Sequence, residues 1–342
     1  MHAGLLVRSL QDMNRNGSAE FGPTPGEAEN SDPSPLDCWY LTGPTASGKT
    51  EIGLELAILL NAEIVSMDSM TLYREMDIGT AKPTAEQRQR VPHHLLDILS
   101  PVEEYSVSNY LKAARRTIAD IRRRGREVLF VGGTPLYLKA LLRGIFEGPP
   151  ADWEFRQQIE EELRTVDLAT LHERLRQVDP LSAAKLHPHD KRRIIRALEV
   201  YYLTGRPISH LQTQFEEGLP AERCKVFVLQ WPRARLHERI HARVDVMFAA
   251  GLVDEVCDLL ARYGSLGRTA SQAVGYREVI EHLEGRRDLT ATIEAVKTRT
   301  RRFARRQETW FRSLSECRFV PMGDETSTVG MAARIAEMGA SR

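Results

Sequence analysis

The residues best suited to chemistry in this 342-residue chain are the eight that read GPTASGKT, starting at Gly43. Two glycines five positions apart, followed by Lys and Thr, form the complete P-loop pattern, in which backbone N–H groups surround a polyphosphate. In this pattern Lys49 adds a point charge, and the hydroxyl of Thr50 can hold Mg²⁺. The loop alone does not say which phosphorylated ligand binds, or for what reaction. The predicted phosphate site comprises Gly43, Pro44, Thr45, Ala46, Ser47, Gly48, Lys49 and Thr50.

Two further segments carry polar groups at the ends of apolar stretches. Asp68 follows the stretch Glu63–Met67, and Gly132-Gly133-Thr134 follows Val128–Val131. A strand that comes after the P-loop helix ends near the loop, so Asp68 can point at whatever the loop holds. At the second turn an NTPase often has an acidic residue for Mg²⁺, whereas this chain offers only backbone groups and the Thr134 hydroxyl. This difference argues against an ATP-hydrolysing motor and for another use of the phosphate site.

Two basic stretches are candidates for nucleic-acid contacts. The first, Asp190–Val200, places Arg192 and Arg196 four residues apart on one helix face. The second, Lys297–Arg312, interleaves arginines with aromatic residues. Phosphate contacts plus stacking aromatics suit RNA, but a kinase lid would explain the first stretch almost as well. Salt-bridged, solvated helix faces would explain both.

Composition limits the remaining classes of function. Lys+Arg and Asp+Glu both total 47, so a nucleic-acid surface has to be a local patch. The four cysteines are scattered without a CxxC pair, which indicates reduced thiols and a cytoplasmic protein. No apolar run approaches the roughly 20 residues of a membrane span. His93-His94, His187 and His189 lack partners at ligand spacing, so we expect turn and packing roles for them.

The elements that must position these groups alternate between strand and helix. Helical patterns at Thr50–Leu60 and Val107–Arg124 lie between apolar candidate strands. Such alternation behind a P-loop predicts an α/β fold, with a parallel sheet, helices on both of its faces, and ligands beyond the carboxyl ends of the strands. The candidate strands are Cys38–Leu41, Glu63–Met67, Leu95–Ile98, Val128–Val131 and Lys225–Gln230.

A second, smaller domain is indicated between two core strands. Residues 150–220 are dense in charge and contain no convincing strand, which predicts an all-helical insert domain. We expect the P-loop core to comprise residues 37–149 and 221–322, and residues 323–342 to be a C-terminal tail. Residues 1–36 are expected to be a disordered tail, with a misassigned start codon as the alternative. The expected insert helices are Phe155–Leu163, Leu168–Val178 and Lys191–Leu203.

Together these motifs resemble the bacterial type of the tRNA dimethylallyltransferases (tRNA isopentenyltransferases). The resemblance runs from about Leu41 to Arg312, and the segment MDIGTAKP at Met76–Pro83 is highly specific. Besides the P-loop, the matching segments are Ser66–Tyr73, Met76–Pro83, Pro92–Asp97, Val131–Thr134, Arg196–Val200 and Val274–Arg277.

The resemblance implies an activity, a cofactor and partners. The family transfers a dimethylallyl group from dimethylallyl diphosphate to the exocyclic amine of the adenosine just 3′ of a tRNA anticodon. The P-loop with Mg²⁺ would then hold a leaving pyrophosphate, and Asp68 matches the general base, with Lys49, Thr50 and Thr134 as further catalytic positions. The implied partners are the tRNA anticodon stem-loop and dimethylallyl diphosphate but no membrane, and we expect a monomer. Positions that match tRNA contacts are Asp68, Ser69, Met70, Thr71, Thr134, Arg156, Arg192, Arg193, Ile194, Ile195, Arg196, Gln272, Ala273, Val274, Gly275, Tyr276 and Arg277.

The chain departs from the family's commonest pattern at three positions. Thr71 stands where Gln is frequent, and Glu75 and Pro135 stand where Gly is frequent. The role of the second basic stretch stays open between tRNA binding and packing. The alternatives to tRNA modification are an adenylate isopentenyltransferase that acts on free nucleotide, a P-loop kinase of small molecules, and a non-catalytic RNA-binding protein.

Overall fold

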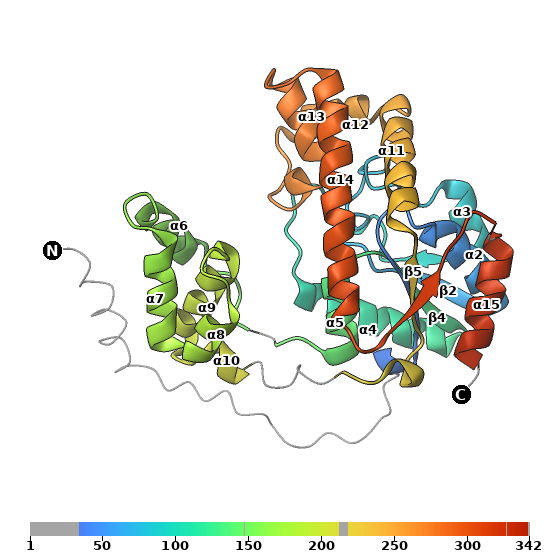
Figure 1. The fold of residues 1–342 in the computed structure, drawn as a ribbon, viewed down its shortest axis with the longest axis horizontal. Helices are drawn as coiled ribbons and strands as arrows, with labels where there is room; N and C mark the ends of the chain where they lie inside the picture. The colour runs from blue at the N-terminus through green and yellow to red at the C-terminus, as the bar shows by residue number, and fades with distance from the viewer. Residues whose placement is uncertain (1–33, 147, 212–217, 326, 341–342) are drawn as a thin grey trace. The chain divides into compact units, whose positions relative to one another are not determined.

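The described part of the chain forms two compact units in a computed structural model (Figure 1). The structure describes residues 34–146, 148–211, 218–325 and 327–340. Over these residues, one unit spans 144–211, and the other joins 34–143 to 218–340. Of the expected N-terminal tail, residues 1–33 lie outside the described residues. Where this expected tail meets the core, Pro35–Asp37 form a short 3₁₀ turn.

The larger unit is built on a six-stranded sheet whose order is β3-β2-β4-β1-β5-β6. Every pairing in this sheet is parallel, which confirms the predicted α/β class. The order β2-β4-β1 places the ends of three strands next to one another, so the loops that follow them are neighbours. The strands are β1 (Trp39–Thr42), β2 (Ala62–Ser66), β3 (His93–His94), β4 (Glu127–Val131), β5 (Val226–Gln230) and β6 (Cys317–Pro321).

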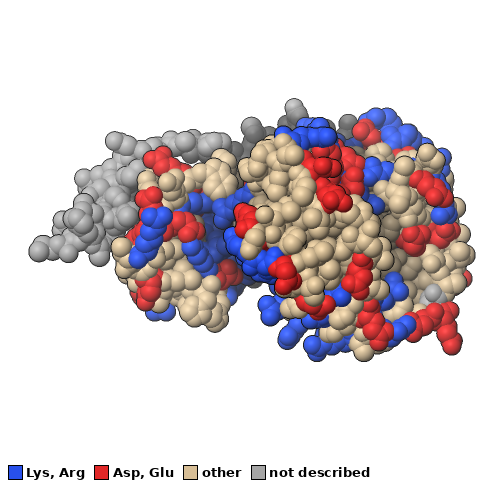
Figure 2. Space-filling model, turned by 90° about the horizontal axis from the view of Figure 1, so that it is seen from above, with Lys and Arg blue, Asp and Glu red and all other residues tan. Residues whose placement is uncertain are grey.

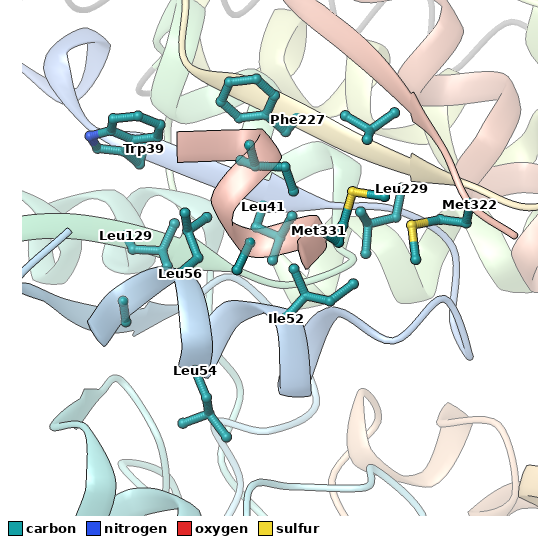
Figure 3. Close-up of a cluster of buried hydrophobic side chains, with 14 of the residues drawn as sticks. Trp39, Leu41, Ile52, Leu54, Leu56, Leu129, Phe227, Leu229, Met322 and Met331 are labelled. Atoms are coloured by element: carbon teal, nitrogen blue, oxygen red, sulfur yellow. The ribbon is translucent and has the colours of Figure 1, made fainter. Parts of the chain in front are cut away.

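Helices cover both faces of this sheet because successive side chains of a strand point to opposite sides (Figure 1). On one face, Leu41 and Leu129 belong to a buried cluster with the side chains of α2 and α15 (Figure 3). The neighbouring residues Tyr40 and Phe130 stack on each other with ring centroids 5.0 Å apart and do not belong to that cluster. The helices of this unit are α2 (Lys49–Leu59), α3 (Ala85–Arg90), α4 (Val107–Arg123), α5 (Pro135–Arg143), α11 (Arg233–Ala249), α12 (Leu252–Tyr263), α13 (Tyr276–Leu283), α14 (Leu289–Arg312) and α15 (Thr328–Ala340).

The predicted strand Leu95–Ile98 is wrong, and the strand in this region is β3, which precedes it. Leu95 and Asp97 both have φ of +56°, a left-handed conformation that no strand accommodates. Asp97 instead turns its carboxylate to Lys82 Nζ at 2.5 Å and to Arg88 Nη1 at 2.7 Å. These charge-assisted bonds stabilise a loop where the apolar pattern predicted a strand.

The C-terminal region is not a tail. Within residues 323–342, helix α15 packs against α2, and its Met331, Ala332 and Ile335 are buried in the same core cluster as Leu41 (Figure 3). The edge strand β6, which the sequence analysis did not predict, pairs with β5 from Cys317 to Pro321. Each of these two elements owes its burial to partners far away in the chain.

The smaller unit is all-helical over the described residues. Four of its helices begin at an Asp that accepts a backbone N–H with its side chain, which satisfies a free donor of the first turn: Asp152, Asp167, Asp179 and Asp190. Residues 212–217 of the expected insert lie outside the described residues. The helices are α6 (Trp153–Glu162), α7 (Leu168–Val178), α8 (Pro180–Lys185), α9 (Lys191–Thr204) and α10 (Ile208–Leu211).

Charged residues of both signs are interspersed over the face of the molecule seen in Figure 2, in line with equal totals of basic and acidic residues. Among the described residues, no helix combines the length and the apolar character that crossing a membrane would require.

Candidate active site

Three loops at the carboxyl ends of neighbouring parallel strands form the candidate site. The P-loop (Gly43–Thr50) follows β1, the Asp68 loop (residues 67–71) follows β2, and the Thr134 turn (residues 132–134) follows β4. At the base of the site Thr42 Oγ1 donates a hydrogen bond to the carbonyl of Gly132 at 2.7 Å. The structure therefore brings together the three segments that the sequence analysis singled out.

The Thr134 turn lies directly against the Asp68 loop. A Cβ at Gly132 would overlap the Met67 carbonyl, so only glycine fits there. The Thr134 N–H donates to this same carbonyl at 3.1 Å, and Thr134 Oγ1 accepts a hydrogen bond from the Ser69 N–H at 3.0 Å. The hydroxyl of Thr134 therefore helps to hold the backbone beside Asp68.

The P-loop adopts backbone conformations that favour glycine. Gly43 has φ of +146° and Gly48 has φ of +91°, while Ala46 adopts a left-handed φ of +63° without being glycine. The side chain of Lys49 folds over the loop, and its Nζ donates to the carbonyls of Gly43 at 3.0 Å and Pro44 at 2.7 Å. A bound anion would compete with these carbonyls for the ammonium group.

Three charged side chains interact at the centre of the site. Desolvation, helped by repulsion from Arg243, lowers the pKa of Lys49 to about 7, and the Asp68 carboxylate opposes this shift. Desolvation also lowers the pKa of Arg243, and here too Asp68 opposes the shift. Asp68 Oδ1 accepts the Met70 N–H at 2.9 Å, which orients the carboxylate locally. The result is one carboxylate beside two desolvated cations, an arrangement suited to an anionic ligand and a proton acceptor side by side.

The sequence analysis missed Arg243. This residue lies on α11, one helical turn after Arg239, whose Nε donates to the carbonyl of Ala46 in the P-loop at 2.8 Å. Residues four apart share a helix face. Arg243 interacts electrostatically with Lys49 and Asp68, and its Nη2 donates to the carbonyl of Thr80 at 3.5 Å. The available signal was this pair of arginines on the helix after the strand Lys225–Gln230.

Two more side chains from distant parts of the chain brace the P-loop. Trp231 Nε1 donates to the carbonyl of Ser47 at 3.0 Å, and Gln307 Oε1 accepts the N–H of Thr45 at 2.9 Å. Each contact joins residues more than 180 positions apart, so sequence spacing could not indicate either one.

Within the Asp68 loop, the predicted tRNA-contact residues differ in exposure. Ser69 and Met70 are half-buried, whereas Thr71 is buried. Thr71 Oγ1 lies 2.7 Å from Ser66 Oγ and donates to the carbonyl of Asp68 at 3.2 Å. The hydroxyl of Thr71 is therefore already hydrogen-bonded inside the loop.

The segment Gln272–Arg277 supports the loop at residues 77–79 as well as offering exposed side chains. Gln272 and Arg277 are exposed, Val274 is half-buried, and the remaining members Ala273, Gly275 and Tyr276 are buried. Tyr276 donates its hydroxyl to Glu255 Oε1 at 2.6 Å. Glu255 also accepts the backbone N–H groups of residues 77, 78 and 79 at 2.9, 2.7 and 3.3 Å. The buried part of this segment is therefore structural, and only its exposed residues are available to a partner.

Two of the three departures from the family pattern have a structural explanation. Glu75 has φ of +63°, the left-handed conformation that glycine adopts easily, and its carboxylate binds Arg262 at 2.8 Å and the hydroxyl of Tyr263 at 3.2 Å. These contacts offset the strain of a side chain at this position. Pro135 is the first residue of α5, where its fixed φ suits the helix and no N–H is needed.

In the helical unit, the predicted contact residues separate into two groups. Arg192 and Arg193 are exposed on α9, whereas Ile194 and Ile195 are buried in the core of the unit and cannot contact a partner directly. Arg156 and Arg196 both bind the buried carboxylate of Glu199, at 2.7 Å through Arg156 Nε and 2.5 Å through Arg196 Nη1. The charges of Arg156 and Arg196 are therefore compensated within the unit.

The second basic stretch, Lys297–Arg312, is partly neutralised by its neighbours. Lys297 binds Asp245 at 2.8 Å, Arg299 binds Glu278 at 2.5 Å, and Arg301 bonds to His241. Further along α14, four arginines are exposed on the helix: Arg302, Arg305, Arg306 and Arg312. The first part of the stretch, Lys297–Arg301, is therefore paired with neighbouring helices, whereas the arginines that follow it are exposed.

The residues of the P-loop are compatible with Mg²⁺. Thr50 is the second residue of α2, where its half-buried hydroxyl follows the lysine of the loop. Mg²⁺ usually takes one or two protein ligands together with phosphate oxygens and water, so a single hydroxyl beside a diphosphate is a sufficient protein contribution. Among the described residues, no group of three or more His, Cys, Asp or Glu side chains is arranged to hold a metal ion.

Comparisons with known proteins show which family the chain belongs to. The family model for IPP transferases matches residues 71–314. A tRNA dimethylallyltransferase from Rhodopirellula baltica is 52% identical over 290 residues, which cover 82% of this chain and 87% of that protein. One from Thermotoga petrophila is 48% identical over 274 residues, covering 80% of this chain and 88% of that protein.

The fold is also similar to solved structures of tRNA-modifying transferases. The tRNA isopentenylpyrophosphate transferase of Bacillus halodurans superposes with a TM-score of 0.63 at 37% identity, covering 89% of this chain and 96% of that one. A eukaryotic dimethylallyltransferase acting on tRNA superposes with a TM-score of 0.70 at 27% identity, covering 87% of this chain and 77% of that one. Because the family model and these relatives match most of its length, the chain belongs to the IPP transferase family.

Proposed function

We propose that this protein is a tRNA dimethylallyltransferase, which transfers a dimethylallyl group from dimethylallyl diphosphate to the exocyclic amine of the adenosine 3′ of the anticodon. The observation that carries the proposal is the convergence of Lys49, Asp68 and Arg243 at the ends of parallel strands. Cations around a phosphate and a neighbouring carboxylate also occur in kinases, where the carboxylate accepts the proton of the attacking hydroxyl. Membership of the IPP transferase family favours prenyl transfer, in which Asp68 would accept the proton of the attacking amine.

In the proposed reaction, the bond between C1 of the dimethylallyl group and the diphosphate oxygen breaks as a bond forms between C1 and the adenine nitrogen. The oxygen leaves as pyrophosphate, and the nitrogen loses one proton to the carboxylate of Asp68. Lys49, Arg243 and the P-loop amides stabilise the charge that develops on the leaving group. A carboxylate that accepts the proton contributes about 10²–10⁴-fold to the rate.

Mg²⁺ is part of the proposal, with Thr50 as its protein ligand. When bound, the ion would neutralise charge on the diphosphate oxygens. On the acceptor side, the exposed residues Arg192, Arg193, Gln272 and Arg277 are the proposed contacts to the tRNA backbone.

The test is incubation of the protein and Mg²⁺ with radiolabelled dimethylallyl diphosphate, in parallel with unmodified tRNA and with AMP. We expect label in tRNA alone. Label in AMP alone would mean that the donor is as proposed but that the acceptor is a free nucleotide. The protein would then be an adenylate isopentenyltransferase. Transfer of labelled γ-phosphate from ATP to a small molecule, without prenyl transfer, would contradict the proposal and indicate a kinase.

A further inference from the structure

Gln307 connects two of the three loops of the site. The side chain lies on α14 and is only 3% exposed. Its Oε1 accepts the N–H of Thr45 at 2.9 Å, and its Nε2 donates to the carbonyl of Gly133 at 2.6 Å. Because a backbone N–H only donates and a carbonyl only accepts, these two partners determine the orientation of the amide.

The two groups that Gln307 joins belong to opposite sides of the proposed reaction. Thr45 lies in the P-loop, which would hold the pyrophosphate. Gly133 precedes Thr134, whose hydroxyl holds the backbone next to Asp68, the proposed proton acceptor. The distance between these two loops is therefore related to the distance between the leaving group and the attacking amine.

The contact leaves little freedom for either loop. A Cβ at Gly133 would lie 2.7 Å from Gln307 Nε2 and 3.7 Å from Lys49 Nζ, so the amide, the turn and the lysine are closely packed. The other braces of the P-loop differ, since Arg239 and Trp231 bind only its carbonyl groups. Thr42 also links β1 to Gly132, but at the strand ends beneath the loops.

We propose that Gln307 is a positioning residue, which sets the separation between the diphosphate-holding P-loop and the Thr134 turn. The inference rests on the proposed prenyl transfer. A displacement reaction is sensitive to this separation, because a misplacement of about 1 Å can cost on the order of 10²-fold in rate. In the proposed reaction the diphosphate contacts the P-loop, and the attacking adenine contacts the side of Asp68. Loss of the Gln307 bridge should therefore lower the reaction rate more than the affinity for either ligand.

The first test replaces Gln307 with methionine, which keeps the length of the side chain and removes both hydrogen bonds. The matched control is Thr300→Val, a buried polar residue of the same helix whose hydroxyl donates only to the carbonyl of Val296, at 2.7 Å. We expect Gln307→Met to lower kcat at least about tenfold, in keeping with the sensitivity of displacement to geometry. The affinities for inorganic pyrophosphate and for tRNA, measured by calorimetry, are expected to stay within about threefold, with the stoichiometry of pyrophosphate binding unchanged. Thr300→Val is expected to resemble the wild type in all of these measurements.

The second test is Gln307→Glu, followed over pH. A protonated carboxyl group can replace both bonds of the amide, whereas an ionised one only accepts and cannot donate to Gly133. The ratio of the variant's kcat to that of the wild type is therefore expected to rise toward one as the pH falls through the pKa of the introduced carboxyl group, determined for the variant by NMR titration. A ratio that stays as low as that of Gln307→Met once this group is protonated would contradict the positioning role.

Other outcomes also overturn the inference. If Gln307→Met has a kcat within twofold of Thr300→Val, the bridge does not position the loops. If its activity and its stoichiometry of pyrophosphate binding fall in parallel, the role is in folding. If wild-type protein transfers no dimethylallyl group to tRNA, the proposed function is wrong, and the positioning inference that rests on it falls with it. Pyrophosphate binding by the two variants then shows only whether Gln307 affects the P-loop.

Discussion

At the scale of single residues, burial and neighbouring charge determine what Lys49 and Asp68 can do. The ammonium of Lys49 has lost much of its hydration and is repelled by Arg243, which favours its neutral form. Asp68 supplies the carboxylate among these three groups, and its Oδ1 accepts a hydrogen bond from the N–H of Met70. Two predictions follow from this arrangement.

The first prediction concerns proton uptake by Lys49. Its pKa of about 7 lies below the ordinary value of 10.5, so in the folded protein it loses its proton as the pH rises through about 7. The unfolded chain binds more protons between these two values, so Lys49 makes stability rise with pH over that window. A bound pyrophosphate favours the charged form of Lys49. At pH 8, pyrophosphate binding to the wild type is therefore expected to take up nearly one more proton per site than binding to Lys49→Met. Calorimetry in buffers of different ionisation enthalpy measures this difference, and equal uptake by both proteins would contradict it.

The second prediction is that Asp68→Asn lowers kcat by about 10²–10⁴-fold, the usual contribution of a general base. An amide oxygen still accepts the N–H of Met70, so the loop keeps its shape. Affinity for tRNA should therefore stay within about threefold of the wild type, as measured by filter binding. A large loss of tRNA affinity with normal kcat at saturation would instead make Asp68 a recognition residue.

At the scale of elements, the site depends on how closely strand ends and loops approach one another. Gly132 lets the Thr134 turn lie against the carbonyl of Met67. In the neighbouring loop, Lys82 is almost fully buried and binds Asp77 and Asp97, each at 2.5 Å. Asp77 and Lys82 of the motif MDIGTAKP are thus explained by loop structure, and Glu255 holds the backbone at residues 77–79.

The third prediction concerns Gly132→Ala. The new Cβ would overlap the backbone of Met67, so we expect a loss of about 1–3 kcal/mol in the free energy of unfolding, typical of overpacking, and a lower kcat because the Thr134 turn is displaced. The control is Gly125→Ala, at a φ of +69° with no atom within 4 Å of the added Cβ. It should cost about 1 kcal/mol through backbone strain alone and leave kcat unchanged. Denaturant unfolding and steady-state kinetics distinguish the two, and equal effects on kcat would contradict the prediction.

At the scale of the whole molecule, the chain combines a P-loop core with a helical unit that carries its own hydrophobic core. With no net charge on the chain, affinity for RNA depends on local groups such as Arg192 and Arg193. Arg156 and Arg196 are paired with Glu199, so part of their charge is neutralised within this unit.

The fourth prediction is that the double variant Arg192→Ala, Arg193→Ala weakens tRNA binding and its dependence on salt. Each lost phosphate contact lowers the slope of log K against log salt by about 0.7–0.9, so we expect a reduction of about 1–2. The kcat at saturating tRNA should remain close to that of the wild type. The control is Arg176→Ala, which removes an exposed arginine of α7 that pairs with Glu173 at 2.6 Å. A slope that changes no more than in the control would show that these arginines do not contact phosphate.

The sequence alone determined the class of fold and the local chemistry. The P-loop, the strands β1, β2, β4 and β5, and three insert helices, α6, α7 and α9, follow from short-range patterns, because glycine conformation, apolar periodicity and helix caps depend on neighbours within a few residues. The short helices α8 and α10 of the insert were not predicted. Asp68 and Thr134 could be placed at the site because the ends of parallel strands meet at one edge of a sheet.

Only the tertiary structure decided which distant side chains complete the site. Arg243, Gln307 and Glu255 act through contacts with residues far away in the chain, and no local pattern marks such partners. For the same reason β6 and α15 were not predicted: an edge strand and a C-terminal helix are stabilised by the surface they cover. The sequence identifies the groups that can react, and the packing of remote elements determines the distances between them.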